Sequence, residues 1–112
     1  MNMRNIDIPK FIDGKMMTGR PIDFRINAQK WHKVISNRTL GAFGEIFVEK
    51  TEIKAIKDLS ELEIKMLGYS SIDEYLSEPF NKGLNENSKK KFIYWSSFRP
   101  NWRIINQILL EK

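Results

Sequence analysis

The chain has 112 residues, of which 41% are hydrophobic and 29% are charged, a balance typical of one folded domain rather than of a disordered segment. It contains no cysteine and a single histidine, which excludes a disulfide scaffold and a zinc site built from thiolates or several histidines, so we expect no metal and no cofactor. Because no apolar run approaches the roughly 20 residues of a membrane-spanning helix, we expect a cytoplasmic protein with no membrane partner.

The net charge of +5 is unevenly distributed along the chain. Residues 1–44 hold eight Lys or Arg and three Asp or Glu, residues 45–78 hold four and nine, and residues 79–112 hold seven and two. If the two ends meet in space, they form one basic face, which would concentrate anions and steer nucleic acid towards it. The alternative is a basic surface that serves only solubility.

The N-terminal segment predicts a short helix followed by an irregular stretch. In residues 8–14, Pro9 suits the first helical turn and Gly14 suits the position just past the end. Residues 15–21 are interrupted by glycine and proline, so we expect a loop or an irregular strand there. Residues 24–27 alternate apolar and polar side chains, which indicates a short strand.

The middle of the chain predicts the longest strand. Residues 45–56 alternate apolar and polar side chains, but the phase shifts near Glu49 and Lys50. A β-bulge produces such a shift, and it would suit a curved, barrel-like sheet. Residues 28–44 fit either a strand or one helical turn followed by a flexible turn, and the pattern does not choose between them.

Two short helices follow, and both carry the same start signal. Ser60 precedes Glu63 by three residues, and Ser71 precedes Glu74 by three, which are capping-box pairs. Gly68 is expected to end the first of these helices.

The C-terminal third predicts a loop, a strand and a helix. Residues 81–91 are polar and end in three lysines, so we expect a solvated loop. The aromatic segment 92–98 is typical of a buried strand, and the apolar side chains from Pro100 onward keep a helical spacing. We therefore expect one domain over residues 1–112, with residues 100–112 as an appended helix.

The order of these motifs resembles that of the ASCH domains, which are small relatives of the PUA RNA-binding fold. The similarity spans roughly residues 5–98 and is carried by three segments: Gly14–Arg20 with its Lys, Thr and Arg, Asp58–Glu63, and Leu67–Leu76. Each motif is short, and their order and spacing together are more persuasive than any one of them.

The resemblance implies an α+β fold, a small and partly closed mixed β-barrel of the PUA/ASCH type with flanking short helices, to which this chain adds its C-terminal helix. It also implies a cleft lined by the Lys-x-x-Thr-x-Arg segment. ASCH domains are mostly regarded as RNA-binding. Some resemble amidohydrolases that deacetylate acetylcytidine with a Thr, a Lys and a Glu, and others are reported as ribonucleases. Lys15 and Thr18 match that Lys and that Thr, whereas the Glu has no secure counterpart.

The chemistry of these side chains agrees in part with a catalytic role. A Thr hydroxyl is a poor nucleophile until a base takes its proton, and a Lys can act as that base only if burial or another cation lowers its pKa. Arg20 would share a face with Thr18 in an extended segment, where it could supply that second charge or hold a phosphate. The alternative is that Lys15 and Arg20 are ordinary solvated charges.

Three functions from different classes follow. The first is binding of RNA or a modified nucleotide in a basic cleft. The second is a hydrolase that uses Lys15 and Thr18, so whether the chain is an enzyme stays open. The third is a bacterial or phage interaction module that forms a homodimer through the C-terminal helix. The residues assigned to ligand binding are Lys15, Thr18, Arg20, Arg25, Trp31 and Tyr69, in which the aromatic rings could stack on bases.

Overall fold

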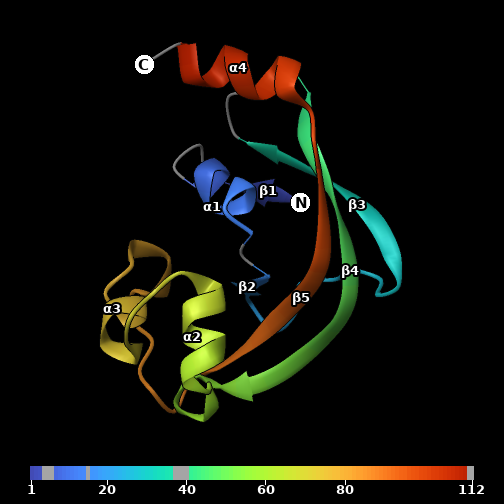
Figure 1. Cartoon of the computed structure of the whole chain (residues 1–112). Helices are drawn as coiled ribbons and strands as arrows, with labels where there is room; N and C mark the ends of the chain where they lie inside the picture. Colours follow the sequence, from blue (N-terminus) through green and yellow to red (C-terminus); the bar gives the residue numbers. More distant parts are fainter. Residues whose placement is uncertain (4–6, 15, 37–40, 111–112) are drawn as a thin grey trace.

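Two long, strongly curved strands form the frame of the structure (Figure 1). They are β4 (Ala42–Ala55) and β5 (Lys89–Pro100), which pair in antiparallel fashion along their length. The computed structural model describes residues 1–3, 7–14, 16–36 and 41–110. Strand β4 confirms the strand predicted over residues 45–56 and begins earlier than the alternation of its side chains indicated.

Three shorter strands complete one mixed sheet in the described part of the chain: β1 (Asn2–Met3), β2 (Met17–Arg20) and β3 (Lys30–Ser36). The spatial order is β1-β3-β4-β5-β2, with β1 parallel to β3 and every other pair antiparallel. The sheet curls so that its two edge strands, β1 and β2, approach each other. This is the partly closed mixed barrel with short helices that the sequence predicted.

A β-bulge lies where the sequence predicted it. The register between β4 and β5 shifts between Val48 and Lys50, so Glu49 has no partner on β5. Gln29, the residue directly before β3, bonds to the bulge. Its backbone N–H donates to Val48 O at 2.6 Å and its side-chain amide donates to Glu49 O at 2.9 Å. Gln29 adopts φ 60° to make both bonds.

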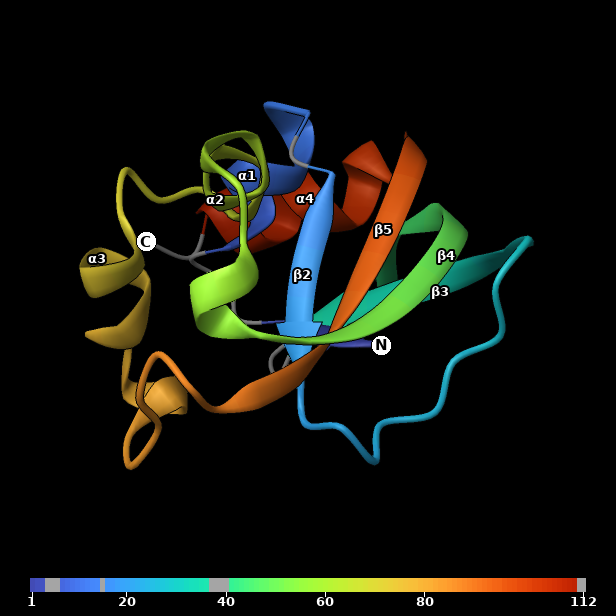
Figure 2. The same ribbon diagram turned by 90° about the horizontal axis from the view of Figure 1, so that it is seen from below.

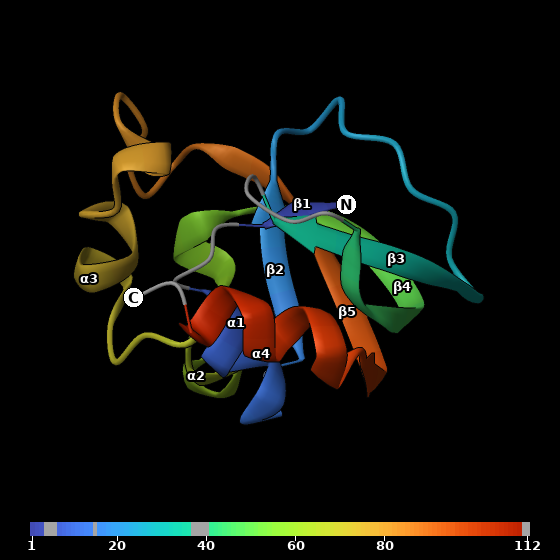
Figure 3. The same cartoon turned by 90° about the horizontal axis from the view of Figure 1, so that it is seen from above.

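Helices cover the ends of the curled sheet. They are α1 (Ile8–Ile12), α2 (Glu61–Leu67), α3 (Ile72–Leu76) and α4 (Trp102–Leu110), with two short 3-10 helices at Ile56–Asp58 and Pro79–Asn81. Pro9 lies in the first turn of α1, and Gly68 ends α2 in the left-handed conformation, as predicted. Seen from above, α4 lies over α1 at one end of the sheet (Figure 3), and both helices contribute side chains to the same hydrophobic cluster.

One of the two predicted capping boxes is complete and the other is half formed. In α2, Ser60 Oγ accepts from the Glu63 N–H at 3.1 Å and the Glu63 carboxylate accepts from the Ser60 N–H at 3.0 Å. In α3, Ser71 Oγ accepts from the Glu74 N–H. The Glu74 carboxylate instead accepts from the Ser70 hydroxyl, because that neighbour is within reach.

Two predictions for the polar segments are wrong. Residues 24–27 form no strand, and the segment between β2 and β3 swings out beside the sheet (Figure 2). It is held instead by a Lys91 Nζ bond to Phe24 O at 2.6 Å. The loop predicted over 81–91 ends at Ser88, because Lys89 already pairs with Ala55 on β4. Backbone pairing with a long neighbouring strand outweighs the low strand preference of lysine.

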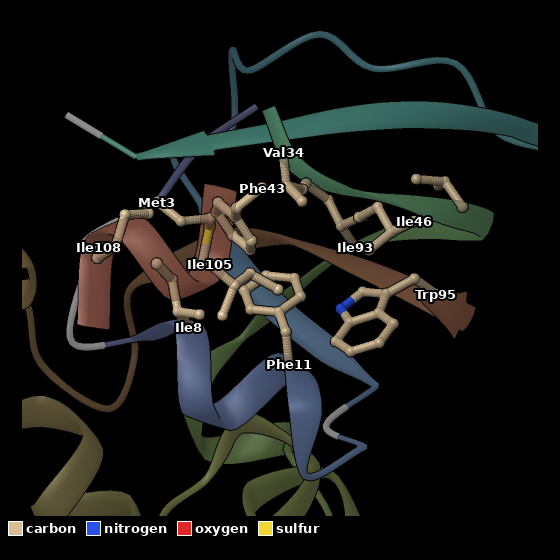
Figure 4. Packing of buried hydrophobic residues seen from close by; sticks show 11 residues of the cluster. Met3, Ile8, Phe11, Val34, Phe43, Ile46, Ile93, Trp95, Ile105 and Ile108 are labelled. Carbon is tan, nitrogen blue, oxygen red and sulfur yellow. The ribbon is translucent and has the colours of Figure 1, made fainter. Parts of the chain in front are cut away.

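Two hydrophobic clusters form the core. Cluster 1 lies inside the curl under α1 and α4, where the Phe11 and Trp95 rings stack with centroids 5.0 Å apart (Figure 4). Cluster 2 packs α2 and α3 against the lower part of the sheet. The buried members of cluster 1 are Met3, Ile8, Phe11, Val34, Phe43, Ile46, Val48, Ile93, Trp95, Ile105 and Ile108. Those of cluster 2 are Met17, Ile56, Leu59, Ile64, Leu67, Tyr69, Tyr75 and Phe92.

A polar network fastens α2 to the sheet. Glu63 accepts from Lys54 Nζ at 2.8 Å on β4 and from the Tyr94 hydroxyl on β5, in addition to its capping bond. Burial alone would raise the pKa of the Glu63 carboxyl. The hydrogen bonds from Lys54, Tyr94 and the Ser60 N–H outweigh it and lower that pKa from 4.5 to about 2.

This network predicts a defined loss of stability in acid. The folded-state pKa of Glu63 lies below its unfolded value, so its contribution is present above pH 4.5 and is lost as the pH falls towards 2. We expect Glu63→Gln to lower the free energy of unfolding at pH 7, and the difference from wild type to shrink across this window. Urea unfolding at several pH values measures it. Glu61→Gln, on the exposed first turn of the same helix, is the control, and an equal pH dependence in both variants would contradict the assignment.

Candidate functional site

Strand β2 presents two of the predicted site residues on one face. Thr18 and Arg20 are two residues apart in a regular strand that pairs with β5, so their side chains point the same way. Arg20 Nη1 donates to Thr18 Oγ1 at 3.2 Å and to Gly19 O at 3.0 Å. The sequence predicted a loop or an irregular strand over residues 15–21. The structure shows a regular strand from Met17 onward, and the prediction that Thr18 and Arg20 share a face is confirmed.

Arg20 also connects the two edges of the sheet. Its Nη2 donates to Asn2 O at 2.8 Å and to the Met3 sulfur, both on β1. Among the described residues, the two edge strands are thus joined by a side chain rather than by a backbone ladder. A gap remains beside β2 where a closed barrel would have paired strands.

A cavity of about 560 Å³ opens at this gap. Met3, Phe11 and Trp95 of cluster 1 form one part of its wall, and Met17, Leu67, Tyr69 and Tyr75 of cluster 2 form another. The cavity therefore lies where the two hydrophobic clusters meet. The described charged residues of its lining are Lys10, Arg20, Lys82, Lys89 and Lys90, and among them stands a single carboxylate, Asp7.

Lys90 is the residue of this cavity that the sequence interpretation missed. Its side chain is 5% exposed, although the sequence placed it in a solvated lysine run. Its Nζ donates to Asn81 Oδ1 at 2.6 Å and to the Tyr75 hydroxyl at 3.0 Å. A signal was present: the period of two in a strand places residue 90 on the same face as the buried Phe92.

The electrostatics of the cavity follow from burial. Burial, and then the positive charge of Arg20, lower the pKa of Lys90 to about 8. Burial raises the pKa of Tyr75 to about 12, so its hydroxyl keeps its proton at neutral pH. Asn81 is itself held in place, since its Nδ2 donates to Tyr75 O at 2.8 Å.

The remaining predicted residues are distributed as follows. Thr18, Arg20 and Tyr69 line the cavity, and Lys10 Nζ lies 5.0 Å from the centroid of the Tyr69 ring. Lys15 lies outside the described residues, so its position beside Thr18 stays a prediction. Arg25 is exposed on the segment between β2 and β3 and is not part of the cavity wall.

Trp31 lies on the outer face of the sheet, away from the cavity. Its ring packs edge-on against Phe47, with centroids 5.6 Å apart, and the Arg99 guanidinium lies 3.6 Å above it. The neighbours of Phe47 on β4, Ile46 and Val48, point into cluster 1, so Phe47 and Trp31 must face the other way. Arg25 and Trp31, which the sequence assigned to the same cleft as Thr18 and Arg20, are therefore not among the residues that line the cavity.

Among the described residues, no three His, Asp or Glu side chains gather closely enough to hold a metal ion. None of the described helices is both long and apolar enough to cross a membrane. The Trp95 indole Nε1 is buried and has no hydrogen-bond partner among the described residues.

Comparison with known proteins identifies the fold. No family model and no curated protein sequence matches the chain. The structure is similar to the crystal structure of ASCH from Zymomonas mobilis, with a TM-score of 0.67 and 13% sequence identity. The match covers 89% of this chain and 67% of that one. The chain therefore has the ASCH fold, as the order of its motifs predicted.

The close packing of β2 predicts that Gly19 cannot carry a side chain. A Cβ built on Gly19 would lie 2.3 Å from the Tyr75 hydroxyl oxygen and 3.4 Å from Lys90 Nζ. Because Tyr75 is 1% exposed and cannot move freely, we expect Gly19→Ala to lower the free energy of unfolding by about 1–3 kcal/mol. Gly41→Ala is the control, since nothing lies within 4 Å of its Cβ. Equal urea midpoints for the two variants would contradict this packing.

Proposed function

We propose that this chain binds RNA or a modified nucleotide, and that one nucleotide unit of the ligand occupies the cavity beside β2. The observation that carries the proposal is the composition of the wall, which combines aromatic rings with five cationic side chains and one carboxylate. Aromatic rings stack on bases, and cationic side chains bind phosphate oxygens. A nucleotide presents both kinds of surface within one small molecule.

The dimensions of the cavity support a ligand of that size. A volume of about 560 Å³ falls within the range of roughly 300–1,000 Å³ that small-molecule sites occupy. The aromatic residues of the wall are Phe11, Tyr69, Tyr75, Phe80 and Trp95. Lys10, Lys82 and Lys89 stand at the wall with Arg20 and Lys90, and they would attract the sugar–phosphate backbone on either side of the bound unit.

The hydrolase alternative has less support from the described residues. A Thr nucleophile needs a base within hydrogen-bond reach. Thr18 Oγ1 instead accepts a hydrogen bond from the Arg20 guanidinium, and no base among the described residues bonds to it. Binding without hydrolysis is therefore the better-supported reading, and catalysis by Lys15 and Thr18 stays a prediction.

The interaction-module alternative depends on α4. Ile105 and Ile108, which motivated a homodimer through this helix, are buried in cluster 1. Trp102, another described side chain on which the homodimer hypothesis was based, is 51% exposed. The helix thus closes the core of its own chain, and its dimerisation stays a prediction.

The proposal predicts a salt-dependent affinity that rests on the cavity lysines. We expect wild type to bind a short single-stranded RNA, and the triple variant Lys10→Ala/Lys82→Ala/Lys89→Ala to bind it more weakly. The slope of log affinity against log salt concentration should fall by about 2, because each neutralised phosphate of a single strand contributes roughly 0.7. Fluorescence anisotropy at several salt concentrations measures both quantities.

A matched control separates a local site from net charge. Lys30→Ala/Lys33→Ala/Lys57→Ala removes the same charge from three exposed lysines that are not part of the cavity wall. We expect this variant to keep most of the affinity and the salt slope. Equal losses in the two triple variants, or no RNA binding by wild type, would overturn the proposed site.

A further inference from the structure

The surroundings of Lys90 are unusual for a buried ammonium group. Charged side chains are rarely buried unless an opposite charge accompanies them. Within the described residues, no carboxylate forms an ion pair with Lys90, and its hydrogen-bond partners, Asn81 and Tyr75, are neutral. The other groups near its Nζ are the rings of Tyr75 and Phe80, at 5.1 and 4.9 Å from their centroids.

The other charged side chains that line the cavity do not offset the positive charge of Lys90. Arg20 on β2 is close enough for its positive charge to act on Lys90, and Lys82 and Lys89 line the same cavity. The carboxylate of the wall, Asp7, lies 3.6 Å from Lys10 on α1. The neighbourhood of Lys90 is therefore net positive and lacks a counter-charge from the described chain.

The geometry leaves Lys90 able to bind a ligand. An ammonium group has three N–H donors, and the two bonds to Asn81 and Tyr75 use two of them. Lys90 is one of the residues that line the cavity. Asn81 and Tyr75 fix the position of Nζ, so little side-chain entropy is lost when an anion arrives.

We propose that Lys90 is the anion-binding point of this cavity and that its ligand carries a phosphate monoester. The inference deepens the proposed function and rests on it, since it identifies the phosphate as the part of the nucleotide that contacts Lys90. A monoester dianion would supply the missing counter-charge to Lys90 and share it with Arg20, Lys82 and Lys89. The same group occurs in a free nucleotide and at the terminus of an RNA strand.

Calorimetric titration tests the assignment at pH 7. The probes are the four ribonucleoside 5′-monophosphates, the four matching nucleosides and inorganic phosphate. We expect monophosphates to bind wild type more tightly than nucleosides. Lys90→Met should weaken monophosphate binding by roughly tenfold to a hundredfold and leave nucleoside binding unchanged, because a charge-assisted hydrogen bond is lost. Lys57→Met, an equal charge change on an exposed lysine, should bind like wild type.

The pH dependence of wild type tests the same assignment without any substitution. The pKa of Lys90 is about 8 in the free protein, whereas a phosphate monoester is already a dianion above pH 7. Monophosphate affinity should therefore fall from pH 7 to 9.5, by at most about tenfold per pH unit above 8, since binding takes up one proton. The affinity for adenosine and cytidine, whose bases do not titrate in this range, should stay constant, and Tyr75 keeps its proton throughout.

The outcomes separate this inference from the function on which it rests. Equal affinities for nucleosides and monophosphates, or a flat pH profile for monophosphates, overturn the role of Lys90 and leave nucleotide binding standing. No binding of any nucleoside, nucleotide or RNA overturns both. Tetranucleotides with and without a 5′-phosphate then identify the source. A preference for the phosphorylated strand over the free monophosphate points to an RNA terminus, and the reverse points to a free nucleotide.

Discussion

The contact on which this structure depends is the one that Arg20 makes between the two edges of the sheet. The sheet order leaves β1 and β2 at opposite edges, and the guanidinium joins them by bonding to Asn2 O and to Met3 on one side and to Thr18 and Gly19 on the other. A planar group with five donors in a fixed fork can make such a set of bonds, and a lysine cannot. Because a side chain closes the curl, an open space remains between the edges, and that space is the cavity.

Strand β5 imposes the second constraint, because both of its faces are buried. Ile93 and Trp95 point into cluster 1, whereas Phe92 points into cluster 2. A strand that serves two cores must be covered on both sides: residues of α1 and α4 pack with Ile93 in cluster 1, and residues of α2 and α3 pack with Phe92 in cluster 2. The strict alternation of a strand then carries Lys90 onto the face of Phe92, under Tyr75.

Burial of an ammonium group beside neutral partners costs stability that an apolar residue would not cost. Natural sequences depart from the usual rules of core composition mainly where function requires it. The departure here is local: Lys90, Tyr75, Asn81 and Gly19 form one contiguous group, and each has a defined contact with another. By contrast, Lys54 and Glu63 on the α2 side form a compensated pair, as expected of a structural contact.

The sequence by itself determined the helix starts, the main strand with its bulge, and the family resemblance. Capping residues such as Ser60 and Glu63, the phase shift at Glu49 and the spacing in α4 act through contacts within a few residues, so they can be recognised without the rest of the chain. Thr18 and Arg20 were found in the same way, because residues two apart in a strand share a face. The order of these signals also indicated the ASCH fold, which the structural similarity confirms.

Only the tertiary structure decided which of those residues share a site. Trp31 and Lys90 show why. Residue type alone predicted that Trp31 lines the cleft and that Lys90 lies in a solvated loop. Burial, however, depends on what the rest of the chain packs against each face. Pairing with β4 turned the lysine run into a strand, and the curl placed Trp31 outside and Lys90 inside. These are long-range contacts, and one sequence does not record them because the residues that make them lie tens of positions apart.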